Sequence, residues 1–148
     1  MNREIVFRGK SVADGEWIYG SYLKTRHYAT GKDLHKIIEY NYSREGRCRE
    51  DVLSETIGQF TGLKDKNGTD IYEGDIVREG EKCSKGEWLW SWDFFVEYSE
   101  HRCGSHTYIG WHIKLIEDGA HGSLSRHSTY HCEVIGNIFD NKELLKTE

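Results

Sequence analysis

Histidines and cysteines gather in the last third of the chain, and their side chains are well suited to binding a metal ion. Six of the eight histidines fall within 31 residues: His101, His106, His112, His121, His127 and His131. Zinc prefers imidazole and thiolate ligands, so His101, Cys103 and His106 are candidates to converge from one loop, with His131 or Cys132 as a fourth ligand. The spacing matches no standard zinc finger, because the chain has no C-x-x-C pair. The alternative is that these histidines lie on the surface and the cysteines are buried as free thiols.

Acidic side chains form a second candidate cluster, in the central segment 57–78. Its carboxylates are those of Asp65, Asp70, Glu73 and Asp75. An EF-hand loop that starts at Asp65 needs glycine at its sixth position and an acid at its twelfth. The sequence has Gly68 at the fourth position and Ile76 at the twelfth, which excludes that loop. Binding of another hard cation stays open beside the simpler interpretation, in which these carboxylates lie in solvated turns.

Motifs for nucleophilic catalysis and for nucleotide binding are missing. Residues 122–126 begin with glycine and serine but do not match Gly-x-Ser-x-Gly, because they end in Arg126 instead of glycine. Gly58 and Gly62 are not followed by the Gly-Lys-Ser/Thr of a phosphate-binding loop. The sequence therefore predicts no catalytic residue, no cofactor and no enzymatic activity.

Aromatic residues alternate along the segment 88–98. Trp88, Trp90, Trp92, Phe94, Val96 and Tyr98 all have the same parity, so a regular strand places them on one face. We expect this stripe to be the core face of a sheet, with a bend or bulge near 91–93 because the run is long for a small domain. The alternative is a platform on which bases or sugars stack, and a tryptophan exposed at a bend would be the better ligand candidate.

The charge distribution argues against binding to duplex DNA. The chain carries 20 basic and 25 acidic residues, a net charge of −5, and its C-terminal half is the more acidic. Proteins that bind duplexes usually present a basic face that neutralises phosphates. The densest basic stretch, Arg44 to Arg49, is interleaved with acids and reads as a solvated loop.

The remaining pattern predicts short strands joined by glycine-rich turns. Residues 3–8 and 16–23 are expected to pair as a hairpin, and 107–116 to pair with 88–98 across a loop at 101–106. Other expected elements are strands at 35–42 and 130–139, a loop at 118–128 and a short helix at 140–146. At 148 residues the chain suits one compact domain. It lacks an apolar run long enough for a membrane span or for secretion, so we expect no membrane association and a cytoplasmic location.

Three blocks of the sequence resemble the YopX-like proteins of bacteriophages and prophages. The most distinctive is GQFTGLKDKNGTDIYEGDIV at 58–77, and the flanking blocks are REIVFRGKSVADGEWIYGSYL at the start and EVIGNIFDNKELL at 133–145. The blocks occur in the expected order and span the chain from Arg3 to Leu145. The signature positions are Gly62, Leu63, Asp65, Asn67, Gly68, Ile71, Tyr72, Glu73, Gly74 and Asp75.

The resemblance implies a mainly β, α+β fold in a single YopX-like domain, residues 1–148. A β-rich sub-domain over 1–70 would precede an SH3-like barrel over 71–148 that is entered at 73–77. The resemblance also implies a phage or prophage origin in a bacterial host, and it brings no catalytic residues and no established activity. Family members often carry a proline before the central block and another in the closing motif, whereas Leu53-Ser54 and Lys142 stand in those places here.

These observations favour a non-enzymatic accessory protein that binds an unidentified protein partner or assembles with itself. We expect a homo-oligomer with the 88–116 hairpin at its interface, because that hairpin carries large apolar side chains on both faces. A nucleic-acid-associated protein that uses the Arg44 to Arg49 loop is the alternative. A metal-dependent enzyme that uses the histidine-rich stretch is a third, less favoured hypothesis.

Overall fold

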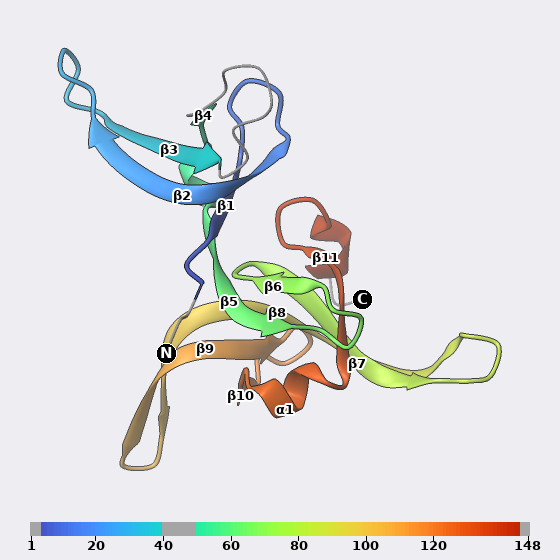
Figure 1. Cartoon of the computed structure of the whole chain (residues 1–148). Coiled ribbons are helices and arrows are strands. Elements are labelled where there is room, and N and C mark those ends of the chain that lie inside the picture. The colour runs from blue at the N-terminus through green and yellow to red at the C-terminus, as the bar shows by residue number, and fades with distance from the viewer. Residues whose placement is uncertain (1–3, 40–49, 146–148) are drawn as a thin grey trace. The chain divides into compact units, whose positions relative to one another are not determined.

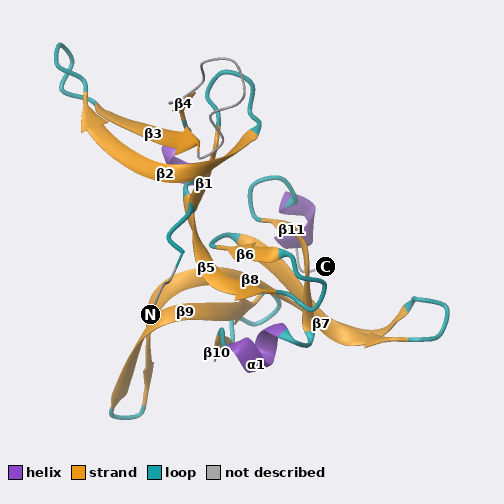
Figure 2. Ribbon diagram, in the orientation of Figure 1, coloured by secondary structure: helices purple, strands orange, loops and turns teal. Residues whose placement is uncertain are grey.

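The computed structural model describes residues 4–39 and 50–145, which fold almost entirely as antiparallel strands (Figures 1 and 2). The chain divides into two compact units, Met1–Phe60 and Thr61–Glu148. The prediction of a mainly β protein is confirmed. The α+β label overstates the helix content, because the only α-helix among the described residues is α1, Arg126–Thr129. No helix in these residues is long and apolar enough to cross a membrane.

The first unit is built on the predicted N-terminal hairpin. Strand β1 (Phe7–Lys10) pairs antiparallel with β2 (Trp17–Arg26). The sheet continues through β3 (Asp33–Glu39) and β4 (Glu50–Asp51) on one side and β5 (Gly58–Lys64) on the other. Ile18, Ile37 and Val52 form its buried core, and a 3₁₀ turn, Ser54–Thr56, precedes β5. The Arg44 to Arg49 loop and the end of the predicted 35–42 strand lie outside the described residues.

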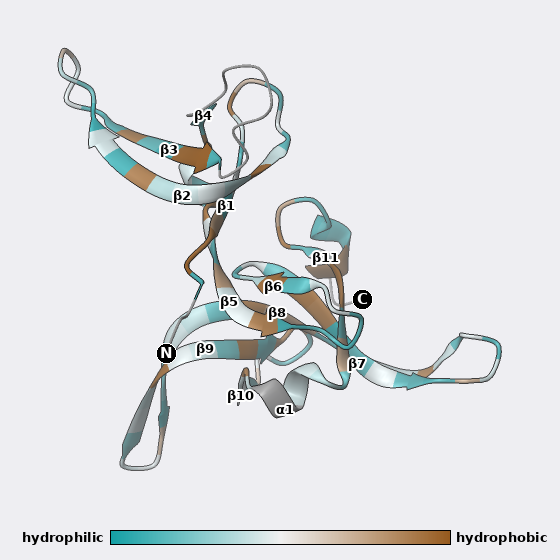
Figure 3. Cartoon of the chain, viewed as in Figure 1, coloured by the Kyte–Doolittle hydropathy of each residue, from teal (hydrophilic) through white to brown (hydrophobic). Residues whose placement is uncertain are grey.

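The second unit begins within β5, which pairs at its end with β6 (Asp70–Tyr72). Its main sheet has the order β10-β9-β8-β7-β11. These strands are β7 (Asp75–Lys82), β8 (Trp88–Cys103), β9 (His106–Leu115), β10 (His121–Ser123) and β11 (Cys132–Asn137). Ile71, Val77, Val96, Ile113 and Cys132 are buried together with Leu124, and Figure 3 shows hydrophobic residues on β6 and the start of β7.

Strand β8 is longer than predicted and belongs to two hairpins. Its first half pairs with β7 and its second half with β9. The prediction of a loop at 101–106 is wrong for most of that range, because Cys103 still pairs with His106. Only Gly104 and Ser105 make the turn. Gly104 has the positive φ of 60° that such a tight turn requires.

The C-terminal third differs from the expected pattern in three places. The predicted loop at 118–128 contains β10 and the start of α1. The predicted strand at 130–139 is shortened to β11, and a register shift interrupts its pairing with β7 between Val134 and Gly136. The predicted helix at 140–146 is a single 3₁₀ turn, Lys142–Leu145, because so short a segment does not sustain an α-helix alone.

Gly74 makes the reversal that starts β7, as the sequence predicted. Its φ is +85°, and its backbone N–H donates to the carbonyl of Val96 at 2.8 Å. A Cβ atom at this position would lie 3.0 Å from Phe139 Cε2. Gly74 therefore satisfies a backbone constraint and a packing constraint at once.

We predict that Gly74→Ala lowers the free energy of unfolding by about 1 kcal/mol or more, because alanine disfavours positive φ and would also press on Phe139. Denaturant titration measures this change. Gly110→Ala is the matched control, because a Cβ at Gly110 in β9 would extend into open space. Equal stability of the Gly74→Ala variant and the wild type would contradict the assignment.

Candidate functional site

Asp65 anchors the turn that carries the signature residues. Its Oδ1 accepts hydrogen bonds from the backbone N–H groups of Asn67 at 2.8 Å and Thr69 at 2.9 Å. Its Oδ2 accepts one from the N–H of Val134 on β11 at 2.9 Å. This buried carboxylate thus ties the central block of the sequence to the closing block, 69 residues later.

The other signature residues also serve the backbone and the core. Asp75 is buried, and its Oδ2 accepts a hydrogen bond from the N–H of Tyr72 at 2.7 Å. Ile71 is fully buried and Leu63 packs against the same core, while Gly62 and Gly68 have positive φ. The signature therefore encodes a turn and its attachment to the sheet.

The four central carboxylates do not form a metal site. Asp65 and Asp75 accept backbone N–H groups, and Asp70 forms an ion pair with Lys64 on the surface. No group of three or more histidine, cysteine, aspartate or glutamate side chains in the described residues is placed to hold a metal ion. The geometry offers no support for the hard-cation interpretation of this segment.

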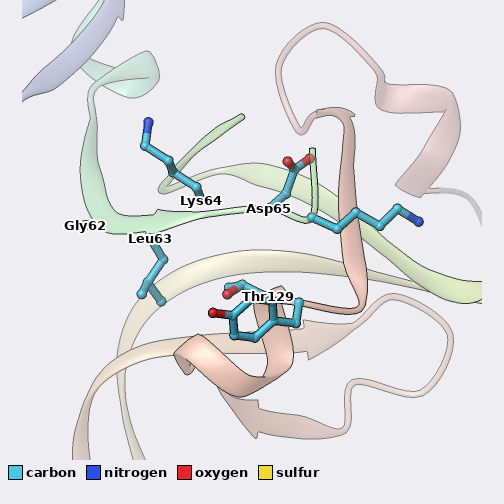
Figure 4. A pocket seen from close by; sticks show the side chains of 7 residues that line it. Gly62, Leu63, Lys64, Asp65 and Thr129 are labelled. Atoms are coloured by element: carbon cyan, nitrogen blue, oxygen red, sulfur yellow. The ribbon is translucent and has the colours of Figure 1, made fainter. Parts of the chain in front are cut away.

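A shallow pocket lies beside the signature turn, with a volume of about 310 Å³ (Figure 4). It is lined by residues 62–66 of the turn and by Thr129 and Tyr130 at the end of α1. Its two lysines are already engaged, since Lys64 pairs with Asp70 and Lys66 with Glu133 at 3.1 Å. No reactive constellation of side chains lines this pocket.

The structure does not bring the predicted zinc ligands together. Cys103 and His106 face each other at the exposed end of the β8–β9 hairpin, whereas Cys132 is buried in the core. His131, the alternative fourth ligand, is exposed beside Cys132. The interpretation of surface histidines and buried cysteines also needs correction, because Cys103 is exposed and His112 is buried.

A different trio of histidines does gather on one face of β8, β9 and β10. The ring of His101 stacks on that of His121 with centroids 5.1 Å apart, and lies 6.1 Å from the ring of His112. Ser99 Oγ lies 3.2 Å from His112 Nδ1, and Glu97 Oε1 lies 3.6 Å from His121 Nδ1. Sequence spacing missed this group, because strand register and not proximity along the chain assembles it.

A bulge at Leu89 divides the predicted aromatic stripe between the two faces of the β7–β8 hairpin. Glu81 pairs with Trp90, but the next residue, Lys82, pairs with Trp88, so β8 contains one extra residue there. The sequence predicts a bulge at 91–93, whereas the structure has it at Leu89, closer to the turn between β7 and β8. Because paired residues in an antiparallel sheet share a face, Trp88 points to the side opposite Trp90 and Trp92.

Three cations surround Trp88 on its side of the sheet. Lys82 Nζ lies 4.3 Å, Lys66 Nζ 5.2 Å and Arg78 Cζ 5.7 Å from the centroid of its ring. Gly80 makes room for this indole, since a Cβ there would lie 2.8 Å from two of its ring atoms. We call this group the cation face.

Carboxylates pair with all three cations of the cation face. Arg78 donates two hydrogen bonds to Asp93, at 2.6 and 2.7 Å, and this pairing raises the pKa of its guanidinium. Lys82 and Lys66 both contact Glu133, at 2.9 and 3.1 Å. The hydrogen bond from Lys82 is the largest cause of the lowered pKa of that carboxyl.

The opposite side of the same hairpin carries two tryptophans beside two glutamates. Trp92 is paired in register with Glu79 and Trp90 with Glu81, and Trp90 Nε1 donates to Glu81 Oε2 at 3.4 Å. Trp90 is 49% and Trp92 47% exposed. We call these four residues the carboxylate–indole face. The prediction that the whole stripe is core is therefore wrong at this end, although Val96 in the middle of β8 is buried.

The far end of β8 is exposed in the same way. Tyr98, which packs edge to face on Trp111 at 5.1 Å, is 55% exposed, and Ile109 is 67% exposed. The strand register places Tyr98, Ile109 and Trp111 on the same face as Val96 and Ile113, which lie farther from the turn of this hairpin. We call residues 97–111 the β8–β9 arm and residues 79–92 the β7–β8 arm.

Comparison with known proteins identifies a family and no activity. The sequence model described as YopX protein matches residues 6–146. No curated protein matches the chain. Among solved structures, protein EF1440 from Enterococcus faecalis is similar, with 18% sequence identity and a TM-score of 0.49 over 98% of this chain and 100% of that one.

We predict that Asp65→Ala lowers the free energy of unfolding by at least about 3 kcal/mol, because three backbone N–H groups lose a charged acceptor in a buried setting. Thermal and denaturant unfolding measure the loss. Asp70→Asn removes an exposed carboxylate from the same turn and should change stability by less than about 1 kcal/mol. Equal effects of the two substitutions would refute the anchoring role of Asp65.

We predict that Cys103 reacts quickly with iodoacetamide in the folded protein and that Cys132 does not. Burial raises the pKa of the Cys132 thiol to about 11, so little reactive thiolate is present at neutral pH, whereas Cys103 is exposed. Peptide mass spectrometry after timed labelling measures the extent of modification at each of the two cysteines. Labelling of Cys132 at the rate of Cys103 without denaturant would contradict the described packing.

Proposed function

The chain belongs to the YopX protein family, and we propose that it is a non-enzymatic interaction module that associates with itself through the β8–β9 arm. The observation that supports this proposal is the row of Tyr98, Ile109 and Trp111 on one face of that arm, with two of the three side chains more than half exposed. Monomeric proteins rarely leave contiguous large apolar side chains in water.

The architecture of the arm explains why it favours a partner. Beyond Ile109 and Glu100, the arm consists of β8 and β9 alone, because β10 pairs only with residues 112–114 of β9. A two-stranded ribbon is marginally stable by itself in water. Contact with a second apolar face would bury its exposed side chains and stabilise it.

The charge pattern of the arm suits contact with a second copy of the same chain. Glu100 and Arg102 form an ion pair at 3.1 Å on this face, so its two nearest charges are balanced. A two-fold interface brings the same patch of both subunits together, and a patch with excess charge of one sign would repel itself. The apolar row and its balanced charges avoid that repulsion.

Nucleic-acid binding gains less support from the described residues. The lysines and the arginine of the cation face are held by Asp93 and Glu133. Phosphate binding there would have to displace these carboxylates. The Arg44 to Arg49 loop, on which the nucleic-acid hypothesis rests, lies outside the described residues.

The biological setting belongs to the same proposal. We place the protein in the cytoplasm of a bacterial host, as a phage or prophage accessory protein without enzymatic activity. The resemblance of the three sequence blocks to phage and prophage proteins supports this setting. A closed, SH3-like barrel in the second unit also stays a prediction.

We predict that the wild type is a dimer at tens of micromolar and that Ile109→Asp shifts it toward the monomer, because a carboxylate would be buried in an apolar contact. Light scattering coupled to size-exclusion chromatography measures the mass. Val12→Asp is the matched control, since Val12 is a similarly exposed aliphatic residue in the first unit. A monomeric wild type at this concentration would refute self-association.

A further inference from the structure

We propose that the carboxylate–indole face binds basic side chains, arginine above all, from an extended segment of a partner protein. This proposal rests on the proposed role of the chain as an interaction module. It gives the β7–β8 arm a basic partner, whereas the β8–β9 arm contacts a second copy of the chain. It is carried by the juxtaposition of Trp90 and Trp92 with Glu81 and Glu79 on one side of the β7–β8 arm.

The carboxylates of this face have no ion-pair partner among the described residues, whereas each cation of the face behind it contacts a carboxylate. Alternation along β7 places Arg78 and Lys82 on the cation face, so the charged residues that β7 contributes beside Trp90 and Trp92 are Glu79 and Glu81. Neither glutamate forms an ion pair with a described residue, and within these residues the carboxylate of Glu81 accepts a hydrogen bond from the Trp90 indole. A cation from outside would therefore find two available carboxylates.

The two indoles favour a guanidinium as that cation. A cation that lies over the face of tryptophan is attracted by the π electrons, and arginine stacks on such a ring better than lysine does. The cation face of the same hairpin shows this chemistry with the chain's own side chains around Trp88. On the opposite side, the indoles are half exposed and carry no cation from the described residues.

The spacing of the face selects an extended partner. Trp90 and Trp92 are two residues apart on one strand, which separates them by about 6.6 Å. The two glutamates opposite them have the same repeat. A partner segment in β conformation with arginine at every second position presents its guanidinium groups at this interval.

A second copy of this face is a poor occupant. A two-fold contact would bring four carboxylates together, and like charges in an interface weaken association. The apolar face of the β8–β9 arm, where Glu100 and Arg102 balance each other, has no such penalty. The two ends of β8 therefore differ in the chemistry of the partner that each accepts.

The test is binding of a fluorescein-labelled hexa-arginine peptide, measured by fluorescence anisotropy at low and at moderate ionic strength. Two variants alter the face: Glu79→Gln with Glu81→Gln, and Trp92→Leu. Glu16→Gln with Glu117→Gln is the control, because it removes the same two charges from exposed positions elsewhere. Circular dichroism verifies that each variant is folded.

We expect the Glu79→Gln/Glu81→Gln variant to lose several times more affinity than the control. Trp92→Leu should weaken binding by about two- to fivefold, the contribution of one exposed cation–π contact. Wild-type protein should bind hexa-arginine more tightly than hexalysine. Equal losses in the two charge variants would show that only net charge matters, and would overturn the proposal, as would unchanged binding by Trp92→Leu.

The same titration on Ile109→Asp separates this inference from the proposed self-association. Binding of hexa-arginine to this variant with wild-type affinity is the expected result, because Ile109 lies on the other arm. If the wild type is monomeric and still binds the peptide through Glu79, Glu81 and Trp92, self-association fails and the basic-partner site stands. If the wild type is dimeric and the substitutions at Glu79, Glu81 and Trp92 do not weaken peptide binding, self-association stands and the basic-partner site fails.

Discussion

The length of β8 is the constraint on which the rest of the second unit depends. Sixteen residues in β conformation extend for about 50 Å, but only Val96 near the middle is buried. The core of Ile71, Val77 and Ile113 covers only that central part. Both ends of β8 must therefore lie outside the core, each held by one partner strand, and Figure 1 shows the two hairpins projecting from opposite ends of this unit.

The single extra residue at Leu89 moves Trp88 to the opposite face at the first of these ends. Without it, Trp88 would share a face with Trp90 and Trp92, and Lys82 would lie on the opposite face. With it, Trp88 joins Lys82, Arg78 and Lys66 on one side, and the two glutamates of β7 stay with the other two tryptophans. Alternation along β7 thus places its positive and negative side chains on opposite faces of the ribbon, and the extra residue in β8 adds Trp88 to the positive face.

The sequence predicted the features that depend on local patterns and missed those that depend on register. The N-terminal hairpin, the alternating strands and the turns at Gly68 and Gly74 follow from alternation and glycine chemistry. The position of the bulge does not, because any residue from Leu89 to Asp93 is compatible with the same alternation. Pairing of Glu79 with Trp92, and the stacking of His101 on His121, need the strand register and were beyond sequence reasoning.

Amide hydrogen exchange tests most directly whether the two ends of β8 are separate contact surfaces. We expect exchange in residues 97–111 to slow as the protein concentration rises from well below to well above that of dimer formation, while exchange in 79–92 is unchanged. Addition of hexa-arginine should then slow exchange in 79–92 alone. Concentration-dependent protection that avoids both arms, or appears first in the N-terminal sheet, would contradict the assignment of two separate surfaces.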